Sequence, residues 1–220
     1  GRPIPAGRVQ PDEALTFGVF LSVAPVLVMG LAVNWTAAAI LGLASAFYIF
    51  VYTMWLKRRT PQNIVIGGAA GAFPPMIGWA AVTGDVSLAS ILLFLLIFLW
   101  TPPHFWALAL FRSGEYQKAG VPMLPVVSGA RETKRQMLIY TILLLPLALA
   151  PTAIGIAGAV YATGAGVLGL LFILSAWQVW REDGEATNHR AAKRMFGYSI
   201  LYLAALFGLL IVDRVPEGMF

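Results

Sequence analysis

Cysteine is absent from this chain, and charged residues are scarce. With no cysteine among 220 residues, disulfide bonds and thiolate metal sites are both excluded. Only 11% of the residues are charged and 59% are hydrophobic, which is far from the balance of a soluble globular domain. The composition therefore indicates a membrane protein.

Seven apolar runs are long enough to cross a bilayer, which requires roughly 20 residues per helix. The runs are continuously apolar and lack the alternation of barrel strands, so they predict an all-α protein. The expected spans are Ala14–Val33, Thr36–Leu56, Ile64–Thr83, Val86–Phe111, Met137–Val160, Ala165–Trp180 and Met195–Val212. No other segment is long enough to build a core of its own, so residues 1–220 form a single transmembrane domain and a nucleic-acid-binding domain is excluded.

Basic residues fall almost entirely on one side of these seven spans. Fourteen of the fifteen Lys and Arg residues lie on that side, and Arg214 alone lies on the other. Because cytoplasmic loops carry the excess of Lys and Arg, we expect the fourteen-base side to face the cytoplasm. The net charge of +5 is thus a consequence of topology, and contact with anionic lipid head groups is the simplest role for each base.

Proline pairs interrupt two of the spans. Pro74-Pro75 and Pro102-Pro103 free backbone carbonyls that neighbours or water must satisfy, so both pairs predict kinked helices bordering a cleft. His104 follows the second pair. An ionisable residue at that depth is a functional candidate, although it could equally cap a freed carbonyl. The small residues Gly67, Gly68 and Gly71 predict a helix-packing face.

Three charges follow the fourth span at three-residue spacing. Arg112, Glu115 and Lys118 share one face if their loop is helical. One acid between two bases could hold an anion and a metal ion, but an ordinary solvated loop explains the same spacing.

Other cations are expected at the same membrane surface. Forked guanidinium groups and lysine charges suit a diphosphate, and magnesium prefers one or two carboxylates with phosphate oxygens and water. A diphosphate at the mouth of an apolar cleft implies an enzyme acting on a prenyl diphosphate. The remaining polar candidates are Arg2, Arg8, Lys57, Arg58, Arg59 and Asn63.

Several long motifs, in order along the first 130 residues, resemble one enzyme family. The chain is similar to the protoheme IX farnesyltransferases, or heme O synthases, a branch of the UbiA-type intramembrane prenyltransferases. The segments that carry the resemblance are Arg2–Val9, Tyr52–Gly68, Gly71–Gly78, Thr101–Ala109 and Tyr116–Val126. From Met137 onward the resemblance is mostly one of hydropathy.

The resemblance implies a nine-helix bundle, seven helices of which are visible here, around a central cavity open to the cytoplasm. It implies transfer of a farnesyl group from farnesyl diphosphate to a vinyl group of protoheme IX, giving heme O, with Mg²⁺ as the cofactor. Lys57 and Arg58 would bind diphosphate, and Glu115 would hold the metal ion. His104 would contact the heme at iron or at a propionate. The other substrate-binding candidates are Arg2, Arg8, Asn63, Arg112, Tyr116 and Lys118.

Two departures from the family pattern matter. The second acidic motif falls on Gly114-Glu115-Tyr116, where Glu115 alone keeps a carboxylate. The first acidic motif would precede the visible start, so we expect an N-terminally incomplete chain that does not act alone. Glu182, Asp183 and Glu185 are read as solvated charges rather than replacements, and His189 as solvated.

Aromatic faces at Tyr52, Trp100, Phe105 or Trp106 could stabilise an allylic cation, although interface belts explain such residues equally well. The expected partners are the two substrates, the lipid bilayer and heme-handling proteins, and the expected location is the inner (plasma) membrane. Another UbiA-type enzyme acting on a quinone or chlorin is the alternative, and a small transporter is a more distant one, disfavoured because no internal repeat is visible.

Overall fold

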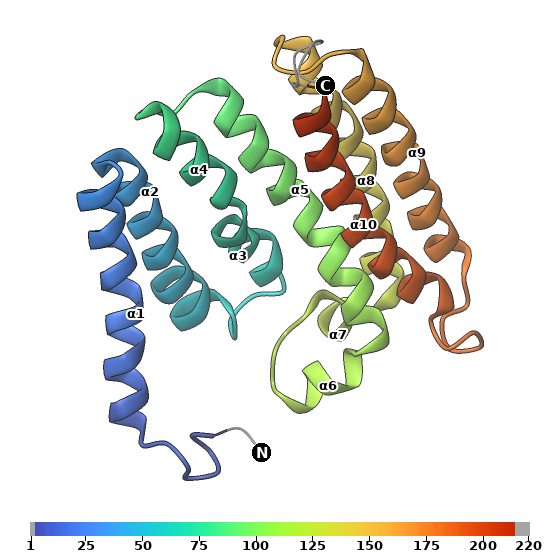
Figure 1. Cartoon of the computed structure of the whole chain (residues 1–220). Helices are drawn as coiled ribbons and strands as arrows, with labels where there is room; N and C mark the ends of the chain where they lie inside the picture. The colour runs from blue at the N-terminus through green and yellow to red at the C-terminus, as the bar shows by residue number, and fades with distance from the viewer. Residues whose placement is uncertain (1–2, 214–220) are drawn as a thin grey trace.

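The computed structural model describes residues 3–213, and every regular element in that range is a helix (Figure 1). The elements are α1 (Pro11–Ala32), α2 (Trp35–Ala46), the π-helix η1 (Phe47–Leu56), α3 (Asn63–Ala72), α4 (Pro74–Thr83), α5 (Leu88–Phe111), α6 (Ser113–Lys118), α7 (Leu124–Val127), α8 (Gly129–Ala153), α9 (Ala159–Arg181) and α10 (Arg190–Val212). Two spans are each built from two elements, α2 with η1 and α3 with α4. The seven predicted spans are confirmed as seven helical segments of sufficient length and hydropathy.

The boundaries of the last three spans were predicted wrongly. The fifth, expected at Met137–Val160, runs from Gly129 to Ala153, and the helices of the sixth and seventh begin at Ala159 and Arg190. Charged residues open α8 and α10 because Lys and Arg are good helix formers whose ammonium and guanidinium groups can reach the interface. The fifth span ends early because Gly155 follows with φ +74°, a left-handed conformation that terminates helices.

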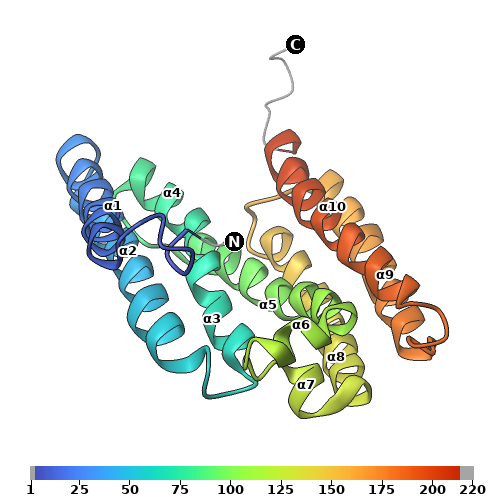
Figure 2. The same cartoon turned by 90° about the horizontal axis from the view of Figure 1, so that it is seen from below.

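The connections alternate between the two ends of the bundle. The η1–α3 turn, α6, α7 and the α9–α10 turn lie at the lower end in Figure 1, and the α1–α2, α4–α5 and α8–α9 connections lie at the upper end. This arrangement agrees with the charge-based order of crossings. The view from below shows the helices from the base-rich end (Figure 2).

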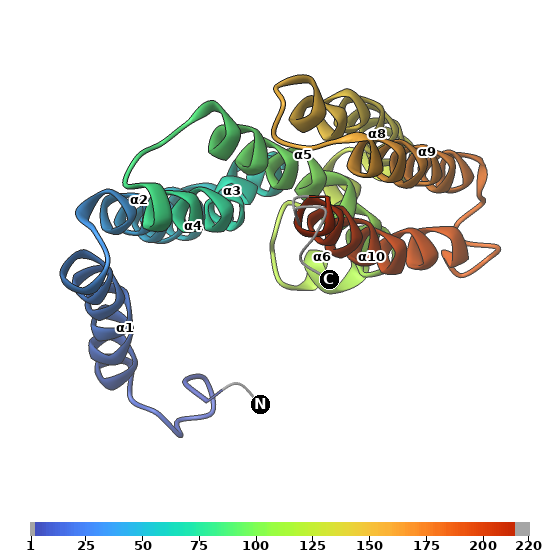
Figure 3. The same cartoon turned by 45° about the horizontal axis from the view of Figure 1, so that its top comes forward.

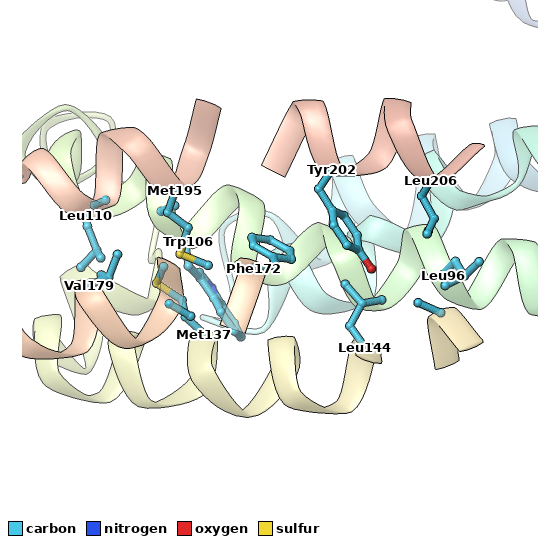
Figure 4. Packing of buried hydrophobic residues seen from close by; sticks show 14 of the residues in the cluster. Leu96, Trp106, Leu110, Met137, Leu144, Phe172, Val179, Met195, Tyr202 and Leu206 are labelled. Atoms are coloured by element: carbon cyan, nitrogen blue, oxygen red, sulfur yellow. The ribbon is translucent and has the colours of Figure 1, made fainter. Parts of the chain in front are cut away.

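Helix α5 stands at the centre of the fold. The main core forms where α8 and α10 pack against α5 and α9 packs against α8 and α10. Its largest fully buried side chains include Trp106, Phe172 and Tyr202 (Figure 4). The other helices follow a curved line from α1 through α2, α3 and α4 to α5 (Figure 3). Much of the surface of α1 is exposed and apolar, as expected for a helix in lipid.

The two proline pairs act differently. The first pair was predicted to kink its helix, and the third span is instead divided into two helices, with Phe73 between α3 and α4 and Pro74 at the first position of α4. Pro102 and Pro103 are buried within α5, which continues as one helix through both. The first pair divides a span, and the second leaves the central helix intact.

Candidate active site

The basic turn after the second span is positioned by the π-helix η1. The backbone N–H of Lys57 donates to the carbonyl of Tyr52 at 2.9 Å, five residues earlier. Lys57 is half-buried, whereas Arg58 is exposed. π-helical segments are rare and occur frequently at functional sites, and no pattern in the sequence predicted this one.

Asn63 closes the same turn. Its side chain is 1% exposed, and Nδ2 donates to the carbonyl of Lys57 at 3.2 Å. Oδ1 is buried and has no hydrogen-bond partner in the described part of the chain. The structure therefore shows Asn63 as a support for Lys57, while its predicted substrate contact stays a prediction.

Glycines on α3 bring two side chains against its backbone. A β-carbon on Gly67 would overlap the Tyr52 ring, and one on Gly68 would meet the Thr101 side chain at 2.8 Å. The predicted packing face is confirmed at these two positions. It is wrong at Gly71, which is exposed and has no described atom within 4 Å of a built β-carbon.

The three charges after α5 lie on or beside a short helix, which from the sequence was only a condition for their sharing one face. One guanidinium nitrogen of Arg112 reaches both carboxylate oxygens of Glu115 at 3.0 Å. Both side chains are largely exposed, at 52% and 69%, and Lys118 is exposed at the end of α6. An ion pair this exposed contributes little to stability, so the pair is free to rearrange around a ligand.

Tyr116 connects this charged helix to the rest of the site. Its ring packs against the cluster of Ile64, Ala109 and Met123, and its phenol interacts electrostatically with the phenol of Tyr52. Burial raises the pKa of Tyr116, although the Arg112 charge opposes that shift. The phenol therefore stays protonated at neutral pH, and Tyr116 joins α6 to the cluster of Ile64, Ala109 and Met123.

His104 lies in an aromatic stack between α5 and α10. Its ring stacks on Trp100 at a centroid distance of 4.3 Å and on Phe196 at 4.7 Å, and Phe105 approaches edge-on at 5.1 Å. Nδ1 contacts Ser199 Oγ at 2.6 Å. The hydrogen bond thus goes to a hydroxyl on another helix rather than to a carbonyl freed by proline.

Trp106 does not belong to this group. It is 1% exposed and meets Tyr140 of α8 edge-on at 5.4 Å. The proposed cation-stabilising role of Trp106 is therefore wrong, because its ring is enclosed in the core (Figure 4). Tyr52, Trp100 and Phe105 remain candidates.

The opening segment precedes α1. Arg8 lies in an exposed turn before α1. Arg2 lies outside the described residues. Their predicted contacts with substrate stay predictions.

A separate cavity of about 670 Å³ lies between the base-rich ends of α5, α8, α9 and the α9–α10 turn, with Lys134, Glu182 and His189 among its lining residues. Glu182 Oε1 accepts from Thr187 Oγ1 at 2.6 Å and from the Ala191 N–H at 2.8 Å. Glu182 is therefore a cap for α10 and was predicted wrongly as a solvated charge, because it is half-buried and its Oε2 is enclosed.

His189 was predicted wrongly as a solvated residue. It is half-buried, and Nδ1 is enclosed without a hydrogen-bond partner among residues 3–213. The cavity beside it is not lined by Lys57, Arg112 or the proline pairs. The cleft expected beneath those residues accordingly stays a prediction.

The chain offers a limited set of metal ligands. Within residues 3–213, no group of three or more His, Asp and Glu side chains is arranged to hold a metal ion. Glu115 supplies one exposed carboxylate beside cations. Magnesium accepts one carboxylate together with phosphate oxygens and water, so these residues fit an ion bound jointly with diphosphate and do not fit a site made of protein ligands alone.

Comparison with known proteins identifies the class of protein first. The UbiA prenyltransferase family model matches residues 1–209, so the chain belongs to that family and is a multi-pass membrane enzyme. A solved structure concerning digeranylgeranylglyceryl phosphate synthase in membranes superposes with a TM-score of 0.79 at 20% identity, covering 97% of this chain and 73% of that one. At this identity the likeness concerns the fold.

Relatives of known name are much more similar in sequence. The chain is 61% identical to a protoheme IX farnesyltransferase of Parvibaculum lavamentivorans, over 97% of this chain and 67% of the relative. It is 57% identical to a protoheme IX farnesyltransferase of Acidiphilium cryptum, over 98% of this chain and 69% of the relative. The chain thus spans about two thirds of the length of these relatives.

Proposed function

We propose that this chain carries out transfer of a farnesyl group from farnesyl diphosphate to a vinyl group of protoheme IX, giving heme O. The observation that carries the proposal is the 61% identity, across 97% of the chain, to a protoheme IX farnesyltransferase. The arrangement around Tyr116 supports it, because this tyrosine joins the charged helix α6 to the cluster of Ile64, Ala109 and Met123 and interacts electrostatically with Tyr52.

The diphosphate is the group that the cations would bind. Lys57 and Arg58 at the end of η1, and Arg112 before α6, can neutralise the charge that builds on the departing oxygen as the C1–O bond of the farnesyl group breaks. Lys118 and Tyr116 add a fourth cation and a phenol donor at the same end of the bundle. Exchange of the Arg112–Glu115 ion pair for contacts to diphosphate costs little, since both side chains are largely exposed.

Magnesium would be held jointly by Glu115 and the diphosphate. When bound, the ion supplies positive charge that stabilises the leaving group. Glu115 would have to turn partly away from Arg112, which frees the guanidinium for a phosphate oxygen. Glu115 and Arg112 would therefore pair with each other before substrate binds, and would bind magnesium and a phosphate oxygen, respectively, once it has bound.

The acceptor would meet the aromatic stack around His104. The vinyl π electrons form a bond to C1 of the farnesyl group, and water captures the resulting cation with loss of one proton. Trp100, Phe105 and Tyr52 could stabilise cationic character through their ring faces. The diphosphate would bind at the base-rich side of the bundle, and we propose that this side faces the cytoplasm. The proposed location of the enzyme is the inner (plasma) membrane.

The proposal is tested with membranes containing the protein, labelled farnesyl diphosphate, and either protoheme or a quinone precursor. Labelled heme product is expected only with protoheme. Labelled quinone, or a chlorin product, would favour another UbiA-type activity. Absence of any transfer together with solute uptake by reconstituted vesicles would favour a transporter and remove the proposal.

A further inference from the structure

The buried contact between His104 and Ser199 joins α5 to α10 across 95 positions of sequence. Ser199 is fully buried, and its Oγ makes two short contacts, one to His104 Nδ1 at 2.6 Å and one to the Phe196 carbonyl at 2.6 Å. Each contact needs one hydrogen between its two atoms.

Only one proton arrangement satisfies both contacts. The serine hydroxyl has a single hydrogen, and the Phe196 carbonyl can only accept. If the hydroxyl donated to Nδ1, the carbonyl and Oγ would face each other at 2.6 Å without a proton between them. The hydroxyl must therefore donate to the carbonyl, and His104 must donate from Nδ1–H to Oγ. The neutral ring then carries its lone pair on Nε2.

The other ring nitrogen is accessible. His104 is 9% exposed. Within the described residues Nε2 has no hydrogen-bond partner, yet it is not among the buried polar atoms that lack one. The exposed part of the ring therefore includes Nε2. No described carboxylate forms an ion pair with His104, so nothing nearby favours a second proton on the ring.

Ser199 is itself held in place. Its carbonyl accepts from Trp100 Nε1 at 2.9 Å, and Trp100 is the ring that stacks on His104 at 4.3 Å. Phe196, whose carbonyl receives the serine proton, stacks on the opposite side at 4.7 Å. The ring is thus fixed in position by two stacking partners and in proton state by one hydroxyl.

We propose that Ser199 is a positioning residue that holds His104 in the Nδ1–H form, so that Nε2 presents its lone pair to the iron of the protoheme substrate. This inference rests on the proposed function for the identity of the iron-bearing ligand. The inference also distinguishes between the two heme contacts expected for His104, with the iron or with a propionate. A propionate would require an N–H donor, whereas iron requires the unprotonated nitrogen that the serine leaves free.

The first experiment needs no heme. The chain has two histidines, so His189→Ala leaves one imidazole, and nitrogen-15 NMR of histidine-labelled protein reports which nitrogen carries the proton. We expect Nδ1–H in this background and a shift toward Nε2–H when Ser199→Ala is added. Ser175→Ala is the matched control, because Ser175 Oγ donates to the carbonyl three residues earlier at 2.7 Å in the same way. An Nε2–H ring in the parent, or an unchanged ring in Ser199→Ala, would overturn the inference.

The second experiment titrates the protein with ferric protoheme and follows its visible absorption spectrum. An imidazole-ligated spectrum is expected for the parent and for Ser175→Ala, and it should be lost in His104→Ala. Loss of a partner that orients a ligating histidine costs roughly 10- to 100-fold in metal affinity, so Ser199→Ala should bind heme about that much more weakly. An imidazole spectrum that survives His104→Ala would refute the iron contact even if heme is still farnesylated. Absence of farnesyl transfer to heme by the parent would instead refute the proposed function, whichever tautomer NMR finds.

Discussion

Two charged clusters at the same end of the bundle use their carboxylates in opposite ways. Glu115 is 69% exposed and pairs with one arginine that is itself 52% exposed. Glu182 is half-buried and uses one oxygen to accept from Thr187 and from the start of α10. Lys134, only 9% exposed, is held nearby by the Glu182 carbonyl at 2.5 Å.

The comparison teaches how to distinguish a structural acid from an available one. A carboxylate whose oxygen satisfies backbone N–H groups at a helix start cannot leave without exposing those groups. A carboxylate in an exposed ion pair can exchange its partner at little cost. The Glu115 cluster is therefore the one expected to affect turnover, and the Glu182 cluster the one expected to affect stability.

The largest effect is expected from Lys57→Ala, which removes one of the cations proposed to bind diphosphate together with the Glu115 cluster. Loss of one charge that stabilises a leaving group costs roughly 10²- to 10³-fold in rate, so kcat for farnesyl transfer should fall by about that factor while the protein remains folded. Arg135→Ala is the control, since Arg135 is a cation at the same end of the bundle, 61% exposed and paired with Glu132. Equal rates for the two variants would remove Lys57 from the site.

The next effect concerns the position of Tyr52. Gly67→Ala places a methyl group where the Tyr52 ring lies, and displacement of a positioned group by about 1 Å can cost up to ~100-fold in rate. We expect at least a tenfold loss of transfer activity. Gly71→Ala, on the same helix with open space around it, should be near normal. Similar activities in the two variants would show that the Tyr52 contact has no role in catalysis.

A smaller effect is expected for the metal ion. Glu115→Gln should raise the half-saturating magnesium concentration about tenfold, because the ion would lose its one carboxylate while keeping phosphate and water ligands. The measurement is the rate at increasing magnesium. Glu185→Gln, an exposed change at the other cluster, serves as the control. A magnesium dependence unchanged by Glu115→Gln would contradict the metal assignment.

The smallest effect should come from Glu182→Gln, and it should fall on stability. Burial tends to raise the pKa of Glu182, but the Thr187 hydroxyl, the backbone N–H groups of α10 and the charge of Lys134 together hold it below its usual value of 4.5. The ionised form is thus favoured by folding, so its contribution is present at neutral pH and is lost as the pH falls through and below that value.

Loss of a helix cap costs about 1 kcal/mol, so a Tm lowered by a few degrees at neutral pH is expected for Glu182→Gln. The difference from the parent should shrink in acid. A difference in Tm that is constant with pH, or a large loss of turnover at permissive temperature, would show that the two clusters are not divided as proposed.

Local sequence features predicted much of the fold and some of the site. The seven spans and their order of crossings followed from hydropathy and charge, because each span must satisfy its backbone within lipid. The fifth span was predicted too far along the chain, because the charged start of α8 does not resemble a membrane segment, although Lys134 and its neighbours belong to the helix. The Arg112–Glu115 pairing was predictable because the two residues are three positions apart in the sequence.

Other parts of the site left no signal that local spacing could reveal. The π-helical winding before Lys57 occurs in a run of apolar and aromatic residues that an α-helix would accept equally well. The burial of His189 and of Trp106 depended on which helices happened to lie beside them. Ser199 was visible only as one polar residue in an apolar run, and nothing nearby in the sequence indicates His104 as its partner.

The sequence by itself determined the number of spans, the base-rich side of the membrane and the family, because hydropathy, charge and motif are properties of contiguous residues. The tertiary structure alone decided that Tyr116 packs against Ile64, Ala109 and Met123, that Glu182 caps a helix while Glu115 stays open, and that Ser199 directs a proton on His104. These outcomes depend on contacts between helices distant along the chain, and the energy of such contacts depends on packing geometry that no local pattern encodes.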